Sequence, residues 1–414
     1  MQNYIFPMKS PNLFRKSSLE MKQKRPTQRW CRVWRCNLPR FALILGGIAL
    51  IFQNPLPVTT FFRNFAAKLQ KMKMKKFNSK VYLYVAATGL LLIIGLVTYH
   101  MMATVSNSDS TIYLYIDDDD TQDSVIVKLQ PMATSAGMAS LSALLRHSDY
   151  SQHVRSGRYA IDPADGPITV FRRLKNGQQS SFNLTIPEVR TLDRLAAVLG
   201  QKLMLDSATI ADALYSQETC QHYGYDTTTI AAMFVPNTYD VYWNMSTDKL
   251  LERMQKEHDR FWDGEREAKA ARMQLTPVEI CTLASIIDEE TANNAEKPMI
   301  AGMYLNRLKA NMPLQADPTI KFALKQFELK RIWQKLLQID SPYNTYKNEG
   351  LPPGPIKIAS IKGIDAVLNA VDHDYFYMCA KEDFSGTHNF ATTYKDHLKN
   401  AARYAKALND RGIK

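Results

Sequence analysis

One uncharged apolar segment limits the folds open to this chain more than any other feature. Residues 81–98 contain no charged side chain, and no Lys, Arg, Asp or Glu occurs between Lys80 and Asp109. An α-helix of this length spans about 27 Å, close to the roughly 30 Å of a bilayer's hydrocarbon core. Since no convincing small-residue cleavage site follows, we expect an uncleaved transmembrane signal anchor over residues 81–104.

The charges on either side of this segment predict its orientation. Five lysines lie between residues 71 and 80, whereas aspartates follow at 109 and 117–120. Positively charged flanks stay in the cytoplasm, so residues 1–80 are expected to form a basic cytoplasmic segment. The rest is then extracytoplasmic and held at the membrane by a single pass. A second apolar run at 41–52 is too short to span comfortably, and residues 1–71 are either an extended start or a disordered tail.

The net charge is distributed unevenly along the chain. Lys and Arg number 52 against 40 Asp and Glu, which gives +12. Residues 1–80 hold 17 of the basic residues and one acidic residue, so the other 334 residues hold 35 basic and 39 acidic ones. A mildly acidic exported part does not suit a phosphate backbone. We therefore expect no nucleic-acid partner.

The cysteines and histidines do not indicate a metal centre. Cys220, Cys281 and Cys379 lie beyond the expected membrane segment, and an odd count leaves room for at most one disulfide. No Cys/His pair has the spacing of a zinc site. We expect neither a metal nor another cofactor, and Cys281 is interpreted as a small buried residue.

The exported part divides into two segments. Residues 110–186 mix short strands with two helices, which favours a small α+β module, and from residue 187 the pattern is helix-rich. The expected fold class is therefore α+β with one N-terminal transmembrane helix. The first segment is expected to have strands at 112–116, 124–129 and 181–186, and helices at 138–145 and 168–175. The second is expected to have helices at 192–199, 208–214, 250–270, 277–291 and 299–309, and a folded loop at 227–246.

The helix expected at residues 277–291 carries an acid on its apolar face. It begins with a capping box and a proline at its first position, in residues 276–279. Glu290 then lies on the same stripe as Leu283, Ile286 and Ile287. Apolar surroundings raise the pKa of a carboxyl group, which a general acid needs near neutral pH. The alternative is a helix-end Glu paired with a buried Arg. Asp288 and Glu289 point elsewhere, and we expect activity without either.

Six ordered sequence blocks extend from this helix toward the C-terminus. They are LASIIDEET (283–291), IAGMYLNRL (300–308), MPLQADPT (312–319), SPYNTY (341–346), GLPPGPI (350–356) and GTHNF (386–390). Their order and spacing over residues 155–405 resemble those of the YceG-like (MltG) endolytic murein transglycosylases. Three places depart from the family pattern: Val189 replaces Gly, Asn237 replaces Asp, and Ile358-Ala-Ser360 replaces Asn-Pro-Gly.

The resemblance implies a single-pass enzyme of the inner (plasma) membrane, with a LysM-like subdomain at residues 110–186 and a YceG-like catalytic domain at 187–410. Such enzymes cleave the MurNAc–GlcNAc bond inside peptidoglycan strands and leave a 1,6-anhydro-MurNAc end. Glu290 matches the family's catalytic glutamate, so the residue pattern and the resemblance select the same side chain. The implied partners are peptidoglycan glycan strands, the membrane and, at sites of growth, peptidoglycan synthases.

Polar and aromatic side chains in the matched blocks are candidates for holding the sugars. Each also has a structural interpretation: Asp317 would cap the next helix, the tyrosines would be core aromatics, and His388 would be a hydrogen-bonded structural residue. Asn306-Arg307 is expected to anchor its helix by pairing. Glu296, six residues after Glu290, is expected to face away from the stripe. The expected substrate-binding residues are Gln315, Asp317, Tyr343, Asn344, Tyr346 and His388.

Two other functions are compatible with the sequence. A hydrolase would use Glu290 with Asp317 as its partner and would produce reducing ends. A non-catalytic scaffold would only bind the cell wall, and the apolar stripe leading to Glu290 argues against it. The mass of the product distinguishes hydrolysis from transglycosylation, because hydrolysis adds a water that the anhydro product lacks.

Overall fold

The computed structural model describes residues 79–329 and 332–412, and residues 79–82 by backbone alone. Most of the expected cytoplasmic segment, with the apolar run at 41–52, therefore lies outside the described residues. The described part is helix-rich and contains three two-stranded antiparallel sheets. The α+β class expected from the sequence is confirmed.

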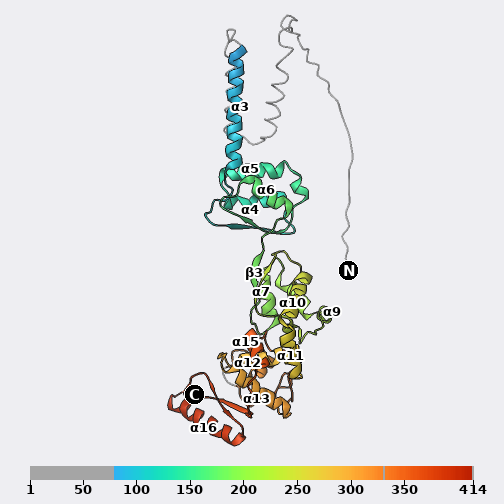
Figure 1. Cartoon of the computed structure of the whole chain (residues 1–414), viewed down its shortest axis with the longest axis vertical. Helices are drawn as coiled ribbons and strands as arrows, with labels where there is room; N and C mark the ends of the chain where they lie inside the picture. The colour runs from blue at the N-terminus through green and yellow to red at the C-terminus, as the bar shows by residue number, and fades with distance from the viewer. Residues whose placement is uncertain (1–78, 330–331, 413–414) are drawn as a thin grey trace, which may run out of the picture. The chain divides into compact units, whose positions relative to one another are not determined.

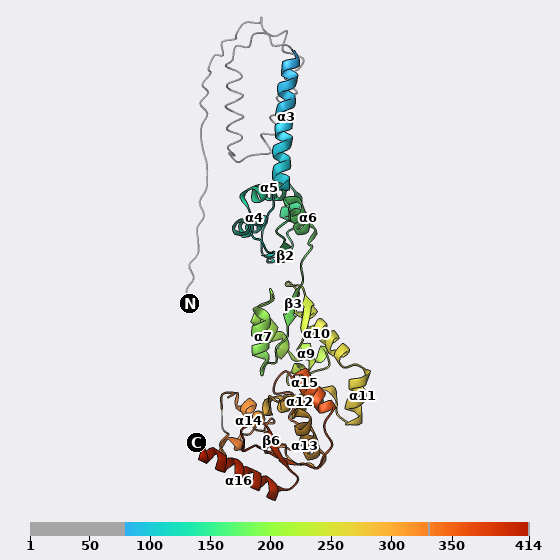
Figure 2. The same ribbon diagram turned by 60° about the vertical axis from the view of Figure 1, so that its left-hand side comes forward.

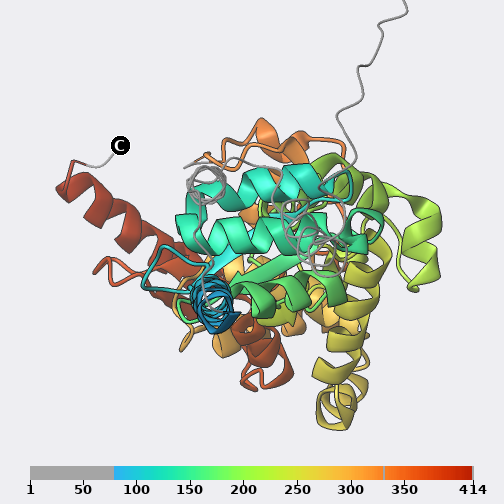
Figure 3. The same cartoon turned by 90° about the horizontal axis from the view of Figure 1, so that it is seen from above.

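Helix α3 (Ser79–Met102) occupies the expected membrane segment (Figure 1). From Leu83 onward it is long and apolar enough to cross a membrane, and its apolar side chains are exposed, Leu91 by 68%. The hydroxyls of Thr88 and Thr98 each donate to the carbonyl oxygen four residues earlier at 2.7 Å, which satisfies polar groups that lipid cannot. Figure 3 shows α3 end-on in blue. The helix is a candidate membrane anchor.

A small hydrophobic core follows α3 in the sequence. Strand β1 (Ile112–Ile116) pairs antiparallel with β2 (Gly157–Ile161), with Leu114 opposite Tyr159. Both of these side chains are fully buried. The other elements are α4 (Gln122–Leu129), η1 (Gln130–Met132), α5 (Ser135–Arg146), η2 (Asp149–Gln152) and α6 (Pro167–Asn176).

The expectation of a strand at residues 124–129 was wrong, because these residues form α4. A reciprocal cap starts the helix: Thr121 N–H donates to Ser124 Oγ at 2.8 Å, and Ser124 N–H donates to Thr121 Oγ1 at 3.3 Å. The buried residues are Val125, Ile126 and Leu129, which is a helical spacing. The run of β-branched residues at 125–127 favours a strand locally, and the cap together with core packing overrides that preference.

A second, larger core begins at β3 (Phe182–Thr185), which pairs antiparallel with β4 (Thr238–Val241). The sequence placed residues 181–186 in the first module, yet Leu184 and Ile186 are buried in the larger core. The folded loop expected at 227–246 contains β4 and the short helix η3 (Ile230–Met233). Strand β3 belongs to the larger core because it pairs with β4, which lies more than 50 residues later in the sequence.

The five helices expected in the second core are present close to their expected ranges, except that one of them is divided in two. The helix expected at 250–270 is interrupted at Trp262, and Asp263 caps a new helix by accepting from Arg266 N–H at 3.1 Å. The five helices before the central one are α7 (Leu192–Gly200), α8 (Ser207–Tyr215), α9 (Gln217–His222), α10 (Thr247–Phe261) and α11 (Gly264–Arg272).

Helix α12 (Pro277–Glu290) is the central helix of this core, in contact with α13 (Lys297–Lys309), α14 (Asp317–Leu324) and α15 (Ile361–Leu368) (Figure 2). The expected capping box is present. Thr276 N–H donates to Glu279 Oε2 at 2.7 Å, and Glu279 N–H donates to Thr276 Oγ1 at 3.2 Å. All residues from 280 to 287 are buried, including Cys281. The core therefore covers all sides of α12 along these residues, whereas the sequence predicted a single buried face.

The C-terminal part is a hairpin and a helix. After η4 (Leu336–Gln338), strand β5 (Tyr377–Ala380) pairs antiparallel with β6 (His388–Ala391), and α16 (Tyr394–Asp410) follows. Arg307 on α13 fixes the start of this hairpin, because its Nε donates to Phe376 O at 2.6 Å.

Candidate active site

Glu290 is the last residue of α12, where the buried helix reaches the surface. The residue as a whole is partly exposed, whereas its carboxyl group is buried. Tyr304 on α13 is 1% exposed, and its hydroxyl donates to Glu290 Oε1 at 2.8 Å. One carboxylate oxygen is thereby held by the core, and the helix end fixes the direction of the group.

Burial raises the pKa of Glu290 to about 7. The hydrogen bond from Tyr304 acts in the opposite direction because it stabilises the carboxylate. The negative charge of Asp317 adds to the rise, whereas the positive charge of Lys321 reduces it. A carboxyl group with this pKa holds a proton on a large share of molecules near neutral pH, and releases it readily.

Asn306 and Arg307 anchor α13, as expected from the sequence. Asn306 Nδ2 donates to His373 O at 2.6 Å and to Tyr375 O at 3.1 Å. Arg307 is 6% exposed and its NH1 donates to Leu314 O at 2.9 Å. Burial lowers the pKa of the Arg307 guanidinium, which stays charged because its ordinary value is so high. These contacts fix the helix that carries Tyr304.

Gln315 lies in an exposed turn beside this cluster, with a left-handed φ of 52°. The turn is fastened to the following block of the chain at Thr345, whose carbonyl accepts from Gln315 N–H and whose hydroxyl accepts from Ala316 N–H, both at 3.0 Å. A non-glycine residue in this conformation is held by its surroundings, a feature that clusters at ligand-binding sites.

Asp317 does not cap the helix that follows it. It is the first residue of α14, and the N-cap residue Ala316 provides no side-chain cap. Instead Asp317 Oδ1 accepts from the Tyr346 hydroxyl at 2.6 Å. Burial, reinforced by this bond, raises the pKa of Tyr346 above its ordinary range. Asp317 is exposed and Tyr346 is half-buried, so both can meet a ligand.

Asn344 lies inside the protein. It is 0% exposed, and its side-chain amide donates to Leu337 O at 3.0 Å and to Ile339 O at 2.7 Å. Its side-chain oxygen accepts from Tyr346 N–H at 3.0 Å. This geometry favours a positioning role: Asn344 shapes the loop that presents Tyr346.

The remaining two expected residues lie in different surroundings. Tyr343 packs against Phe322 with ring centroids 4.7 Å apart, and burial raises its pKa to about 12. His388 begins β6, where its Nδ1 lies 2.9 Å from Glu296 Oε2 and its N–H donates to Glu296 Oε1 at 2.6 Å. Helical spacing from Glu290 does not apply to Glu296, because α12 ends at Glu290. Glu296 is buried and orients the His388 ring.

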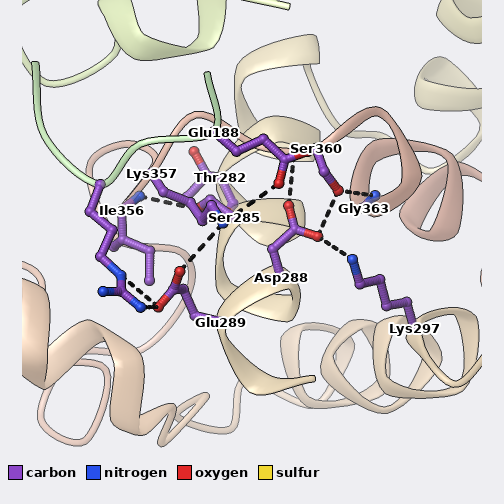
Figure 4. A network of polar contacts seen from close by, with 11 residues as sticks. Glu188, Thr282, Ser285, Asp288, Glu289, Lys297, Ile356, Lys357, Ser360 and Gly363 are labelled. Atoms are coloured by element: carbon purple, nitrogen blue, oxygen red, sulfur yellow. Dashed lines mark hydrogen bonds and ion pairs between the residues drawn. The ribbon is translucent and has the colours of Figure 1, made fainter. Parts of the chain in front are cut away.

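Asp288, which we expected to be dispensable, belongs to a buried polar network (Figure 4). Its side chain is 2% exposed and pairs with Lys297 Nζ at 2.7 Å. It also accepts from Ser360 N–H at 2.7 Å and from the Ser360 hydroxyl at 2.8 Å. A Cβ on Gly363 would lie 2.5 Å from Asp288 Oδ1. Asp288 therefore ties the starts of α13 and α15 to the end of α12.

Glu289 forms ion pairs on another side of α12. Arg190 NH2 lies 2.8 Å and Lys357 Nζ 3.4 Å from its carboxylate oxygens, and the side chain is 15% exposed. Arg190 precedes α7 and Lys357 precedes α15. The residue next to the candidate acid therefore joins two distant parts of the chain.

The departures from the family pattern are accommodated locally. Ile358 N–H donates to Val189 O at 2.9 Å, so two of the departing segments are directly bonded. Ser360 caps α15 by accepting from Gly363 N–H at 2.8 Å, in addition to its bonds with Asp288. Asn237 precedes β4, and its carbonyl accepts from Ile186 N–H at 2.9 Å.

Two adjoining hollows lie on the Glu289 side of α12. The first has a volume of about 220 Å³, and we call it the Arg190 pocket. The second, of about 370 Å³, includes Glu289 and shares residues 189–191 and Lys357 with the first. Glu290 lines neither, so the candidate acid lies beside these hollows. The residues of the Arg190 pocket used below are Val189, Arg190, Phe322, Lys325, Tyr343, Lys357 and Ile358.

Sequence reasoning missed Tyr304 and the cations around Glu289. Tyr304 stands in the block IAGMYLNRL, four residues after Ile300 and three before Arg307, on the face that α13 buries. That spacing marks it as a core residue, and nothing in it indicates a hydrogen bond to Glu290.

The sequence matches a known protein family over most of its length. The model of the YceG-like family matches residues 114–403, which is more than half of the sequence. The chain belongs to the YceG-like family. The match includes Glu290, Tyr304 and every expected substrate-binding residue.

The chain is similar to several proteins that have names. The endolytic murein transglycosylase of Bacillus subtilis is 28% identical over 274 residues, which cover 62% of this chain and 75% of that protein. One of the same name from Streptococcus pneumoniae is 24% identical over 297 residues, and the match covers about half of its length, 52%. A YceG-like protein of Listeria monocytogenes has a crystal structure with 25% identity and a TM-score of 0.47, covering 70% of this chain and 99% of that one.

Proposed function

We propose that this chain is a membrane-anchored endolytic peptidoglycan transglycosylase. It cleaves the MurNAc–GlcNAc bond of glycan strands, with Glu290 as general acid and then as base. The observation that carries the proposal is a carboxyl group on a partly exposed residue at the end of a buried helix, with its pKa raised by burial to about 7 and one oxygen held by Tyr304. Membership of the YceG-like family and the names of the Bacillus and Streptococcus relatives support activity on peptidoglycan.

The reaction has two steps that use both protonation states of Glu290. In the first, Glu290 donates its proton to the glycosidic oxygen while the bond from that oxygen to the anomeric carbon of MurNAc breaks. In the second, the C6 hydroxyl of the same MurNAc attacks that carbon, and the Glu290 carboxylate accepts the hydroxyl proton. The products are a 1,6-anhydro-MurNAc end and a free GlcNAc hydroxyl, so no water is consumed. An internal nucleophile already held near its target lowers the barrier by several kcal/mol, roughly 7–11 at best.

The other site residues would hold the strand around this acid. Gln315 in the fastened turn, Asp317 at the start of α14 and Tyr346 in the neighbouring loop would offer polar groups to the sugars. Asn344 would position the loop that carries Tyr346. Tyr343 would provide an aromatic face, and His388 a ring oriented by Glu296. The part of the 110–186 module before β3, with its β1–β2 pair and helices, would be a LysM-like subdomain that contacts the glycan. The catalytic domain, expected at residues 187–410, would begin at β3 and lie outside the cytoplasm, with synthases among its neighbours.

One observation favours hydrolysis as the second candidate reaction. The charge of Asp317 is close enough to Glu290 to raise its pKa, and Asp317 is exposed. A second carboxylate near the acid is the arrangement by which hydrolases activate water or stabilise the transition state. The bond from the Tyr346 hydroxyl occupies one Asp317 oxygen, which leaves the other for such a role.

Product analysis tests the proposal. Purified peptidoglycan sacculi are digested with the wild-type protein and with Glu290→Gln, and the new ends are identified by mass spectrometry. We expect anhydro ends from the wild type and a loss of at least about 100-fold in Glu290→Gln, because the amide has no proton to transfer.

Glu279→Gln is the matched control. It removes one negative charge from the same helix, and Gln also completes a capping box, so activity should be retained. Reducing ends in place of anhydro ends would establish the hydrolase, and the absence of any new ends would overturn both reactions.

A further inference from the structure

The Arg190 pocket has no part in the two-step reaction, and its wall is positively charged. Arg190, Lys325 and Lys357 line it, and neither Asp nor Glu does. Arg190 and Lys357 share the Glu289 carboxylate, and Lys357 also lies 3.8 Å from the half-exposed Glu188. Lys325 Nζ lies 4.0 Å from the centre of the Phe322 ring. The lining itself therefore has three cations and no carboxylate. Two further carboxylates lie behind it, because Tyr215 and Thr228 of the lining donate to Asp193 and Asp226.

Apolar surface completes the pocket. Phe322 and Tyr343 meet at 4.7 Å between ring centroids, and Val189 and Ile358 line the same wall. The Ile358 N–H bond to Val189 O closes that wall with backbone contacts. A ligand for this pocket should therefore combine an anionic group with small apolar groups.

The size and position of the pocket indicate a branch of the substrate. Its volume of about 220 Å³ is below the roughly 300–1,000 Å³ of pockets that enclose whole ligands, so it suits a short side branch. Both Arg190 and Lys357 contact Glu289, the residue before the candidate acid. A substrate branch bound in this pocket would therefore belong to a sugar close to Glu290.

We propose that the Arg190 pocket binds the carboxylate-bearing peptide stem of the MurNAc beside the cleaved bond. This inference rests on the proposed function. A peptidoglycan stem begins with an amide on the lactyl group of MurNAc and carries small apolar side chains together with free carboxylates. Arg190 binds the carboxylate through the N–H donors that its pair with Glu289 leaves free. Lys325 adds a second charge, and the Phe322–Tyr343 rings receive the methyl groups. The enzyme therefore prefers strands that keep their stems.

Kinetics with two substrates test this preference. Glycan strands are used intact or after an amidase has removed their stems, and kcat/KM is measured on both. The wild type should favour intact strands, and the ratio should fall about tenfold or more in the double variant Arg190→Gln/Lys325→Gln, since each loses a charge-assisted contact. Glu289 keeps Lys357 as a partner in this variant. The control is Lys309→Gln, an exposed lysine at the end of α13, which should leave the ratio unchanged.

A binding measurement separates this inference from the proposed reaction. The full chain in detergent is titrated with an N-acetylmuramyl tetrapeptide, or with the same compound whose carboxylates are amidated. We expect tighter binding of the free acid and loss of the difference in the double variant. Equal affinity for both compounds, or a difference that survives in the double variant, would overturn the stem pocket. No turnover is involved, so this result stands even if product analysis rejects the transglycosylase.

Discussion

Glu290 is subject to two opposing influences that together fit a residue working as both acid and base. Burial favours the neutral carboxyl group, and the hydroxyl of Tyr304 favours the carboxylate. A fully buried acid without a donor would hold its proton too tightly for the first step. A well-solvated one would have lost its proton at neutral pH. The balance between these contacts is a property of individual residues.

The pH dependence of the reaction follows from the pKa of about 7 at Glu290. The first step needs the protonated acid, so kcat/KM should decline as the pH rises through about 7. Turnover of soluble glycan strands between about pH 5 and pH 9 measures this limb. A decline centred near 4.5, the ordinary value for Glu, would mean that Glu290 is solvated and would contradict the buried-acid argument.

Replacing Tyr304 should move the same limb. In Tyr304→Phe the carboxylate loses its donor, so the pKa of Glu290 rises and the limb shifts to higher pH. The rate should also fall roughly tenfold, because a bond to a charged group stabilises by about 1.5–3 kcal/mol. Tyr242→Phe removes a hydroxyl from a side chain that is 54% exposed and should leave the profile unchanged. A slower enzyme with an unshifted limb would reduce Tyr304 to a packing role.

At the scale of elements, the end of α12 is fixed by contacts with two other helices. Asp288 joins Lys297 at the start of α13 to Ser360 at the cap of α15. Glu289 joins the segments before α7 and α15 through Arg190 and Lys357. Both carboxylates lie within two residues of Glu290, so these contacts set the direction in which the helix presents its acid.

Asp288→Asn should therefore destabilise the fold. Both partners of its ion pair are buried, with 2% and 7% of the side chains exposed, and breaking such a pair costs about 3–5 kcal/mol. Thermal or denaturant unfolding of the full chain in detergent measures the loss. Glu265→Gln breaks the exposed pair with Lys269 and should cost less than about 1 kcal/mol. Equal stability of the two variants would show that Asp288 does not hold these helices together.

At the scale of the whole molecule, the proposed reaction requires α3 to place residues after 102 outside the cytoplasm. The lysines at residues 71–80 and the aspartates at 109 and 117–120 predict this orientation. A reporter enzyme that works only outside the cytoplasm, fused after residue 110, should be active in living bacteria. The same reporter fused at residue 78 should be inactive. A stable but inactive fusion after residue 110 would reverse the orientation.

The sequence alone determined the features that depend on neighbouring residues. The capping box at Thr276 and Glu279 and the apolar segment of α3 are local patterns. Glu290 belongs with them, because its place on an apolar helix face follows from spacing along one helix. Where local preference and core packing disagreed, as at residues 124–129, the sequence pattern gave the wrong element.

Only the tertiary structure decided which side chains meet. Tyr304 is 14 residues from Glu290, Ser360 is 72 from Asp288, and Arg190 is 99 from Glu289. Asn344 was expected from the sequence to bind sugar, and its complete burial favours a positioning role. The physical reason is that periodicity reports which face of an element is apolar, whereas contacts between elements depend on how those faces pack.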